Sequence, residues 1–212
     1  HEEAPINPTY AYYNTRESLD DARVKFDKVK ELTIKLSMVE NSAYRLANNI
    51  KKTQKRANAL KIGDKIPEKL GVDANGKEVK ASDYAGKRLA IYFYPKDNTP
   101  GCTAEACSLR DGYDALRSAG YEVIGVSKDS AASHGKFAAK HSLPFTLIAD
   151  TDTTLNQAFG VWQKKKMAGR EYMGTVRTTF LVDGDGTVTD IIAKVDTKNS
   201  ASQILEIINK KA

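Results

Sequence analysis

The chain has two cysteines, and both lie in one short segment behind a strand-like run. The residues from Leu89 to Tyr94 are mostly aromatic or aliphatic, which is typical of a buried strand. Residues 95–101 then carry Pro, Asp, Asn and Gly, which favour a turn. Cys102 and Cys107 follow this turn. Because the thiolate is the reactive form of cysteine, the surroundings of each sulfur decide which one can attack a substrate.

Cys102 is predicted to lie in the first turn of a helix that runs from Thr103 to about Ser118. Apolar side chains recur there three and four residues apart, at Ala106, Leu109, Tyr113 and Leu116. The first turn of a helix presents free N–H groups and the positive end of the helix dipole, which both favour an anion. Cys102 is therefore the cysteine that we expect to be a thiolate.

Cys107 is five residues further along the chain. At ~1.5 Å per residue it lies roughly 7.5 Å along the helix axis and on another face. An intact helix holds such a pair beyond the ~7 Å Cα separation that a disulfide tolerates. A bridge would require the first turns to unwind, which suits a bond made and broken during turnover. The alternative is that Cys107 is an inert cysteine of the core.

The residues around Cys102 resemble a known motif. Pro95-x-x-x-Thr99-x-x-Cys102 is similar to the peroxidatic motif of the peroxiredoxins, and residues 99–107 resemble the PrxQ, or bacterioferritin comigratory protein, group. The resemblance continues through residues 169–174 and 177–183 and covers about residues 61–212. It implies an α/β, thioredoxin-like fold for this part of the chain.

The resemblance also implies a role for each cysteine. Cys102 would be the peroxidatic cysteine, which attacks a hydroperoxide and becomes a sulfenic acid. Cys107 would be the resolving cysteine, which condenses with it to an intramolecular disulfide. A thioredoxin-type reductant would then regenerate both thiols. No cofactor or metal is implied, since sulfur carries the redox change.

Three further residues receive roles from the same resemblance. Thr99 would hydrogen-bond the peroxide, Arg177 would stabilise the thiolate and the leaving oxygen, and Pro95 would shield Cys102 from water. Glu105 is a weaker candidate, because glutamate in a first helical turn is favoured in any case. The expected substrates are hydrogen peroxide and small organic hydroperoxides.

A second function with the same fold is a thiol:disulfide oxidoreductase. That chemistry normally uses a Cys-x-x-Cys pair, whereas here four residues separate Cys102 from Cys107 and Thr99 precedes them. A third possibility is that residues 1–60 make the chain part of an assembly to which a peroxidase is attached.

Residues 1–60 are predicted to be a helical extension that associates with a partner. Small and apolar residues recur at alternating steps of three and four at Val29, Leu32, Leu36, Val39, Ala43, Leu46, Ile50, Thr53, Ala57 and Leu60. Such a narrow stripe is typical of a coiled coil or helical hairpin. The alternative is a helix packed on its own neighbouring domain. Residues 46–60 resemble part of the long helix of the D-type central-stalk subunit of V/A-type ATPases. Residues 1–15 are expected to be irregular or docked by their aromatic side chains.

Composition excludes several classes of protein. The chain has 212 residues and a net charge of +6, but its 33 basic residues are dispersed among 27 acidic ones. The two basic clusters, residues 51–56 and 164–166, are expected to be solvated helix or loop faces, so no nucleic-acid binding is predicted. The sequence has no apolar run that would span a membrane. Two cysteines in reactive spacing favour a reducing compartment, hence the cytoplasm.

Two histidines and two large aromatic residues complete the candidates. His134 and His141 lie on a predicted helix over residues 130–141, with no further ligands at metal-binding spacing, so they are expected to be surface or packing residues. Trp162 and Tyr172 are expected to border the site or to support its loop, although core packing would also explain them.

Overall fold

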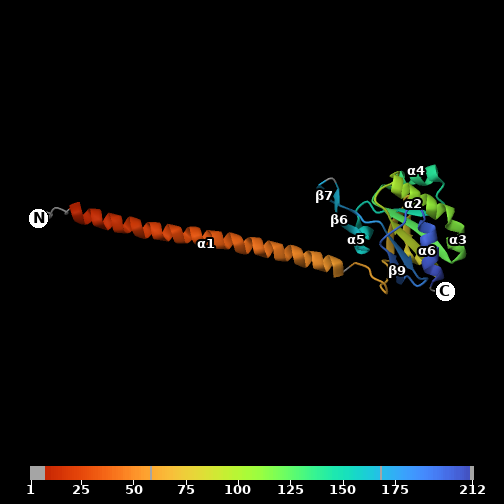
Figure 1. Ribbon diagram of the computed structural model, residues 1–212, viewed down its shortest axis with the longest axis horizontal. Helices are drawn as coiled ribbons and strands as arrows, with labels where there is room; N and C mark the ends of the chain where they lie inside the picture. Colours follow the sequence, from red (N-terminus) through yellow and green to blue (C-terminus); the bar gives the residue numbers. More distant parts are fainter. Residues whose placement is uncertain (1–7, 58, 168, 211–212) are drawn as a thin grey trace. The chain divides into compact units, whose positions relative to one another are not determined.

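A computed structural model gives the fold and describes residues 8–57, 59–167 and 169–210. The chain divides into two compact units, His1–Gln54 and Lys55–Ala212 (Figure 1). The described part of the first unit is helical, and the second unit is an α/β domain. Across the described residues, no helix has the length and apolar character needed to cross a membrane.

The second unit is built on a mixed sheet. Seven strands of the described chain form it, in the order β2-β1-β5-β4-β3-β8-β9. They are β1 (Lys69–Asp73), β2 (Glu78–Lys80), β3 (Arg88–Phe93), β4 (Tyr121–Ser127), β5 (Thr146–Ala149), β8 (Thr178–Val182) and β9 (Val188–Ile192). β3, β4 and β5 are parallel, whereas β8 pairs antiparallel with β3. Strands that alternate with helices and end in a hairpin confirm the predicted α/β class.

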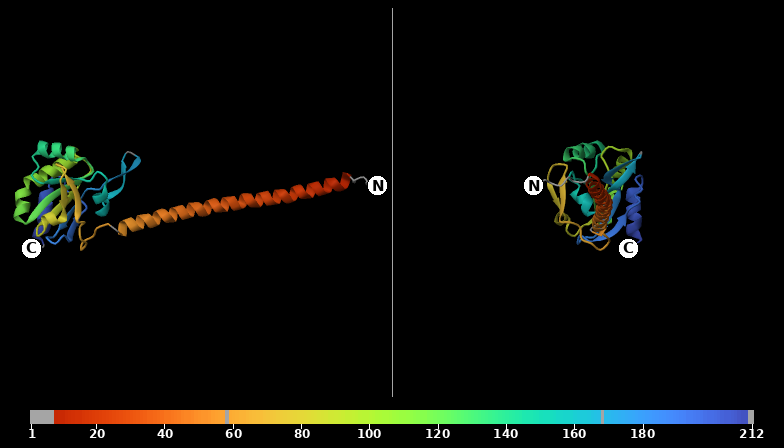
Figure 2. Two further views of the ribbon diagram at one scale, coloured as in Figure 1. Left: turned by 180° about the vertical axis from the view of Figure 1, so that it is seen from behind. Right: turned by 90° about the vertical axis from the view of Figure 1, so that its left-hand side faces the viewer.

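Two hydrophobic clusters lie on opposite faces of this sheet. Side chains alternate along β3, so Tyr92 belongs to one cluster and Phe93 to the other. The first cluster lies under α2 (Pro100–Asp111), α3 (Tyr113–Ser118), α4 (Ala131–His141) and α6 (Ser200–Asn209) (Figures 1 and 2). The second lies under α5 (Thr154–Ala158) and the short helix η1 (Ala81–Tyr84). Both faces of β3 are thus buried, which fixes the strand that precedes the cysteines.

The single helix predicted from Thr103 to about Ser118 is instead two helices. α2 begins earlier, at Pro100, and Gly112 separates it from α3. A Cβ atom at Gly112 would lie 2.4 Å from the Cβ of Ala201 in α6. The close approach of α6 therefore requires glycine at this position.

A separate hairpin of β6 (Trp162–Met167) and β7 (Arg170–Thr175) was not predicted. It projects away from the main sheet (Figure 2). The basic cluster of residues 164–166 lies on β6, so the expectation of a helix or loop face is wrong for it. The cluster is nevertheless at least partly exposed, which agrees with a solvated face.

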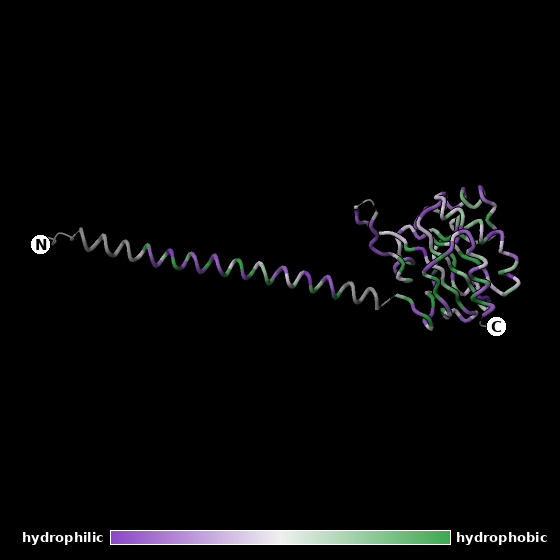
Figure 3. The backbone as a smooth tube through the Cα atoms, viewed as in Figure 1, coloured by the Kyte–Doolittle hydropathy of each residue, from purple (hydrophilic) through white to green (hydrophobic). Residues whose placement is uncertain are grey.

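The first unit is dominated by α1 (Pro8–Ala57). The expectation of an irregular segment over residues 1–15 is wrong for residues 8–15, which are helical, while residues 1–7 lie outside the described residues. Figure 3 shows apolar residues recurring between hydrophilic ones along the helix. Leu60, which the predicted stripe included, lies beyond the end of α1 and packs against the second hydrophobic cluster.

Candidate active site

Cys102 lies in the first turn of α2, directly beyond the carboxyl end of β3. Thr99 is the N-cap residue, Pro100 is the first helical residue, and Cys102 is 1% exposed. The Thr99 side chain does not cap the helix, and its hydroxyl instead donates to the Lys96 carbonyl at 3.0 Å. The predicted position of Cys102 is therefore confirmed, at a helix end whose N–H groups favour an anion.

Arg177 reaches Cys102 from the other side of the site. It directly precedes β8, which pairs with β3 and so carries the guanidinium to the end of that strand. One of its nitrogens, Nη2, donates to Cys102 Sγ at 3.2 Å, and Nη1 donates to Glu105 Oε2. A guanidinium is permanently charged, so Arg177 places a fixed positive charge beside the sulfur.

Glu105 is a buried carboxyl group one turn after Cys102. It is 0% exposed, and burial raises its pKa from 4.5 to about 7, although the charge and hydrogen bond of Arg177 act in the opposite direction. Among the described residues its Oε1 has no hydrogen-bond partner, and neither does the hydroxyl of Tyr92. Arg177 therefore contacts two groups that can each carry a negative charge, the Cys102 sulfur and the Glu105 carboxyl group.

Cys107 lies on the same helix but apart from this cluster. It is partly exposed, both cysteines are free thiols, and α2 is continuous from Pro100 to Asp111. Arg110 is a polar neighbour of its sulfur. The structure thus has the intact helix that holds the two sulfurs on different faces.

Pro95 begins the loop that joins β3 to α2, and its side chain is partly buried. The loop also contains Asn98, whose positive φ of 58° marks a tight bend. The structure thus brings Cys102, Arg177 and Glu105 into contact, with Thr99 and Pro95 in the connecting loop.

Sequence reasoning missed a buried polar cluster behind this loop. Asp97, in the loop, and His134, on α4, are 5% and 0% exposed, and the His134 Nδ1 lies 2.9 Å from an Asp97 carboxylate oxygen. His134 was expected to be a surface or packing residue, and it is a packing residue with polar partners. The only sequence signal was a histidine in a helical segment rich in small residues.

Trp162 and Tyr172 lie on the β6–β7 hairpin. Trp162 pairs with Thr175 in register, and Tyr172 pairs with Lys165 and is 42% exposed. The expected place of both residues at the border of the site stays a prediction.

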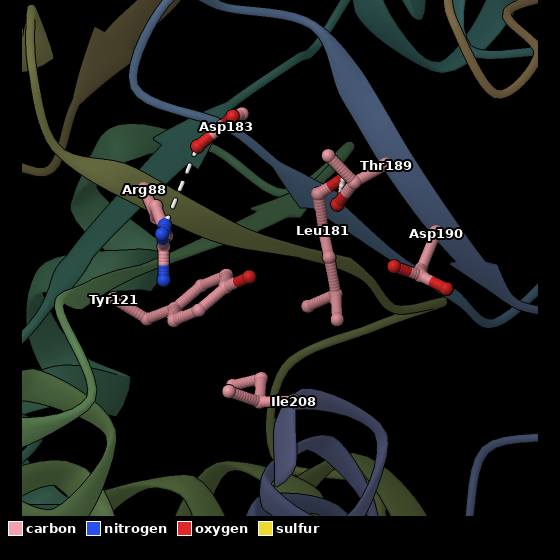
Figure 4. Close-up of a pocket in the computed structure, with 7 residues that line it drawn as sticks. All are labelled: Arg88, Tyr121, Leu181, Asp183, Thr189, Asp190 and Ile208. Atoms are coloured by element: carbon pink, nitrogen blue, oxygen red, sulfur yellow. Dashed lines mark hydrogen bonds and ion pairs between the residues drawn. The ribbon is translucent and has the colours of Figure 1, made fainter. Parts of the chain in front are cut away.

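One cavity of the second unit is at the other end of the sheet. It has a volume of about 260 Å³, and its lining includes Arg88, Tyr121 and Asp183 (Figure 4). Arg88 and Tyr121 begin β3 and β4, whereas Cys102 follows the end of β3. Within the described ranges, no group of three or more His, Cys, Asp or Glu residues could hold a metal ion.

Comparison with known proteins gives two family matches. Residues 62–191 match the AhpC/TSA family, and residues 1–67 match the ATP synthase D-subunit family. The second match agrees with the resemblance noted for the amino-terminal helix. The two overlap only at the junction between the helix and the α/β domain.

Curated relatives and solved structures agree with the first match. Peroxiredoxin Bcp of Bacillus subtilis is 45% identical over 149 residues, covering 70% of this chain and 95% of the relative. Peroxiredoxin Bcp of Escherichia coli is 40% identical over 155 residues, covering 73% of this chain and 99% of the relative. A structure of Xanthomonas campestris Peroxiredoxin Q has a TM-score of 0.62 and 37% identity, covering 66% and 88% of the two chains. The mixed sheet and its helices thus form a thioredoxin-like fold, as predicted.

Proposed function

The chain belongs to the AhpC/TSA family, in the Bcp/PrxQ group of peroxiredoxins, and is a thiol peroxidase; on this basis we propose that Cys102 is its peroxidatic and Cys107 its resolving cysteine. The observation that carries the proposal is the contact of 3.2 Å between Arg177 Nη2 and Cys102 Sγ. A buried sulfur at a helix N-terminus, next to a fixed cation, has the surroundings that make a cysteine nucleophilic.

In the first step the Cys102 thiolate attacks the terminal oxygen of the hydroperoxide. The S–O bond forms while the O–O bond breaks, and the leaving oxygen departs as an alcohol or as water after taking up a proton. Negative charge moves from sulfur to the leaving oxygen during this step. Arg177 is already placed beside the sulfur, so its charge is available without rearrangement to stabilise the leaving oxygen.

Thr99 and Pro95 assist this step in different ways. The Thr99 hydroxyl donates to the Lys96 carbonyl, so its oxygen is left to accept a hydrogen bond from the O–H of a peroxide. Pro95 has no N–H group and contributes apolar surface to the loop, which limits water near the sulfur. Glu105 orients Arg177 through their ion pair.

In the second step the thiolate of Cys107 attacks the sulfenic sulfur of Cys102. The S–S bond forms and the hydroxyl leaves as water. Because α2 is continuous over both residues, its first turns must unwind before the sulfurs can meet. A dithiol of the thioredoxin type then reduces the disulfide. This cycle needs a reducing compartment, and we place the enzyme in the cytoplasm.

Intact mass measurement tests the two roles. The reduced protein receives one equivalent of hydrogen peroxide with and without a sulfenic-acid trap. We expect the wild type to lose two hydrogens, Cys107→Ser to be trapped as a sulfenic acid at Cys102, and Cys102→Ser not to react. A Cys102→Ser variant with normal turnover would refute the assignment.

The same samples distinguish the alternative of a thiol:disulfide oxidoreductase. If the wild type reduced a small disulfide within seconds but failed to react with hydrogen peroxide, the oxidoreductase function would replace the peroxidase cycle proposed here. The four-residue spacing of the cysteines and the contact with Arg177 favour the peroxidase.

We also propose that residues 1–60 form an association segment in which α1 pairs with α1 of a second copy, in parallel. The seam is the set of residues Val29, Leu32, Leu36, Val39, Ala43, Leu46 and Ile50, all exposed. They fill alternate positions of a heptad repeat, with Val29, Leu36, Ala43 and Ile50 at a and Leu32, Val39 and Leu46 at d. The β-branched residues at a and the leucines at d favour a parallel two-stranded coiled coil. Lys35 at g, which pairs with Glu31 of its own helix, would then also face Glu40 at e of the other copy.

A matched pair of substitutions on α1 tests this pairing. Leu36 lies in the seam, whereas Ile34 is equally apolar and exposed but lies off it. We expect sedimentation to give a dimer for the wild type and for Ile34→Glu, and a monomer for Leu36→Glu. A monomeric wild type, or dimers that dissociate equally in both variants, would contradict the proposal.

A further inference from the structure

The Asp97–His134 pair has no part in the steps above, although Asp97 lies in the reactive loop itself. Asp97 precedes Thr99 by two residues and Cys102 by five. Both side chains of the pair are almost completely buried. Burying two ionisable groups is unfavourable unless each finds several partners, so the pair must be held by further hydrogen bonds.

Asp97 is held by three side chains and one further carboxylate. Its oxygens accept hydrogen bonds from Tyr94 Oη at 2.8 Å and Ser133 Oγ at 2.7 Å, in addition to His134. Its backbone N–H donates to Asp129 at 2.8 Å. Burial raises the pKa of Asp97, but the hydrogen bonds from His134 and Ser133 outweigh it and lower the pKa below its ordinary value. Asp97 is therefore held as a carboxylate.

His134 faces hydrogen-bond acceptors on both sides of its ring. Nδ1 lies 2.9 Å from the Asp97 carboxylate, and Nε2 lies 3.1 Å from the carbonyl oxygen of Ile148 in β5. Both ring nitrogens therefore lie within hydrogen-bond distance of a polar partner. The ring links β5 and α4 to the loop.

The two ends of this link differ in whether they must move during turnover. His134 and Ser133 belong to α4, and Ile148 belongs to β5 in the middle of the sheet. Asp97 belongs to the loop that leads into α2, whose first turns must unwind for a disulfide to form. Asp97 thus connects a segment that must move to a scaffold that can stay in place.

We propose that the Asp97–His134 pair is a tether that holds the reactive loop in its peroxide-binding arrangement and thereby slows the unwinding of α2. The proposal rests on the two-cysteine cycle proposed above. Asp97 and His134 are positioning residues, since neither touches the reacting sulfur in the structure.

The tether has opposite effects on the two chemical steps. It keeps Thr99 and Cys102 in place, so loosening it slows the attack on peroxide. Loosening it also populates the unwound helix, so formation of the disulfide with Cys107 becomes faster. A sulfenic acid that waits longer can react with a second hydroperoxide to give a sulfinic acid and an alcohol or water, so the tether also raises the yield of that product.

Two substitutions test the tether, and a third is a matched control. Asp97→Asn keeps the shape of the side chain but removes its charge, and His134→Gln removes the ring. His141→Gln changes the other histidine of α4, which is partly exposed and packs on Phe137. Rapid-mixing kinetics of the reduced full chain then give separate rates for peroxide oxidation and for disulfide formation.

We expect both tether variants to lose about tenfold or more in the rate of oxidation, the size expected for a lost charged hydrogen bond. We expect disulfide formation to become several-fold faster and the sulfinic yield under excess peroxide to fall. The control should match the wild type in all three measurements. If both rates fell together, or if neither differed from the control, the pair would have only a structural role.

Hydrogen exchange on the reduced protein tests the tether without any peroxide. In Asp97→Asn we expect the amides of residues 97–107 to exchange faster than in the wild type, with those of α4 unchanged. Uniformly faster exchange would indicate global destabilisation and overturn the proposal. Hydrogen exchange also separates the tether from the two-cysteine peroxidase cycle, because it does not depend on peroxide. A wild type that fails to react with peroxide would reject the proposed cycle but would leave the exchange result intact.

Discussion

Glu105 makes the stability of the second unit depend on pH in a way that one substitution can isolate. Its pKa is about 7 in the folded protein and 4.5 ordinarily. Between these values the folded state holds a proton that the unfolded state has released, so stability falls as the pH rises. The contribution is complete below pH 4.5 and is lost as the pH passes through about 7.

The difference between the two pKa values of Glu105 sets the expected size of this effect. At about 1.4 kcal/mol per pH unit, the difference in pKa corresponds to roughly 3 kcal/mol in the free energy of unfolding. Glu105 is fully buried, so solvent screening does not reduce this figure. Glu105→Gln keeps an oxygen for Arg177 but does not titrate. The free energy of unfolding of Glu105→Gln should therefore not show this fall with rising pH. The other titrating groups contribute equally to both proteins.

Urea unfolding of the reduced protein, followed by fluorescence, measures this difference. Trp162 is the only tryptophan, and it lies in the second unit, so melting of α1 does not contribute to the signal. We expect the free energy of unfolding of the wild type, relative to Glu105→Gln, to fall by roughly 3 kcal/mol from pH 4.5 to pH 8. Glu206→Gln, which alters an exposed carboxylate, should run parallel to the wild type. Parallel curves for Glu105→Gln and the wild type would refute the reasoning.

Substitutions at three further positions test the site and the core. Arg177→Met should slow oxidation of Cys102 by roughly a hundredfold, with partial recovery in Arg177→Lys; stopped-flow rates within twofold of wild type would exclude the role. Thr99→Val should slow the same reaction about tenfold while Thr99→Ser retains it, and equal rates would remove Thr99 from the mechanism. Gly125→Ala places a Cβ 2.6 Å from Leu147, so urea unfolding should show a loss of about 1–3 kcal/mol, and an unchanged midpoint would contradict this packing.

The position of Cys102 could be predicted because the signals for it are local. A run of strand-forming residues, a turn and a helical pattern follow one another within about two dozen residues, so strand, loop and helix were all identified, although the helix begins at Pro100 and not at Thr103. The turns at Gly76 and Gly186 have equally local signals, because both glycines have the positive φ that such turns favour. The break at Gly112 was not predicted, because it depends on contact with Ala201, far along the chain.

Partners that are distant in sequence could not be predicted from local patterns. Arg177 is 75 residues from Cys102, and only the resemblance to peroxiredoxins pointed to it. His134 is 37 residues from Asp97, and no spacing rule joins a histidine on one helix to an aspartate in an earlier loop. Such pairs arise from the order of strands in the sheet, which places the end of β3 beside β4 and β8. Sequence therefore identified the proposed nucleophile more readily than the residues proposed to position it.

The contacts of Arg177 suggest how oxidation itself prepares the helix to unwind. Before the reaction Arg177 is shared between Cys102 and Glu105, and its bond to sulfur ties the first turn of α2 to β8. A sulfenic acid is neutral when protonated, so after oxidation Glu105 becomes the stronger partner for the guanidinium. The first turn then loses one attachment, and the link through Asp97 becomes the main restraint on the loop. We therefore expect Asp97→Asn to accelerate disulfide formation more than it accelerates opening of the reduced helix, and hydrogen exchange on reduced and trapped sulfenic forms would reveal the difference.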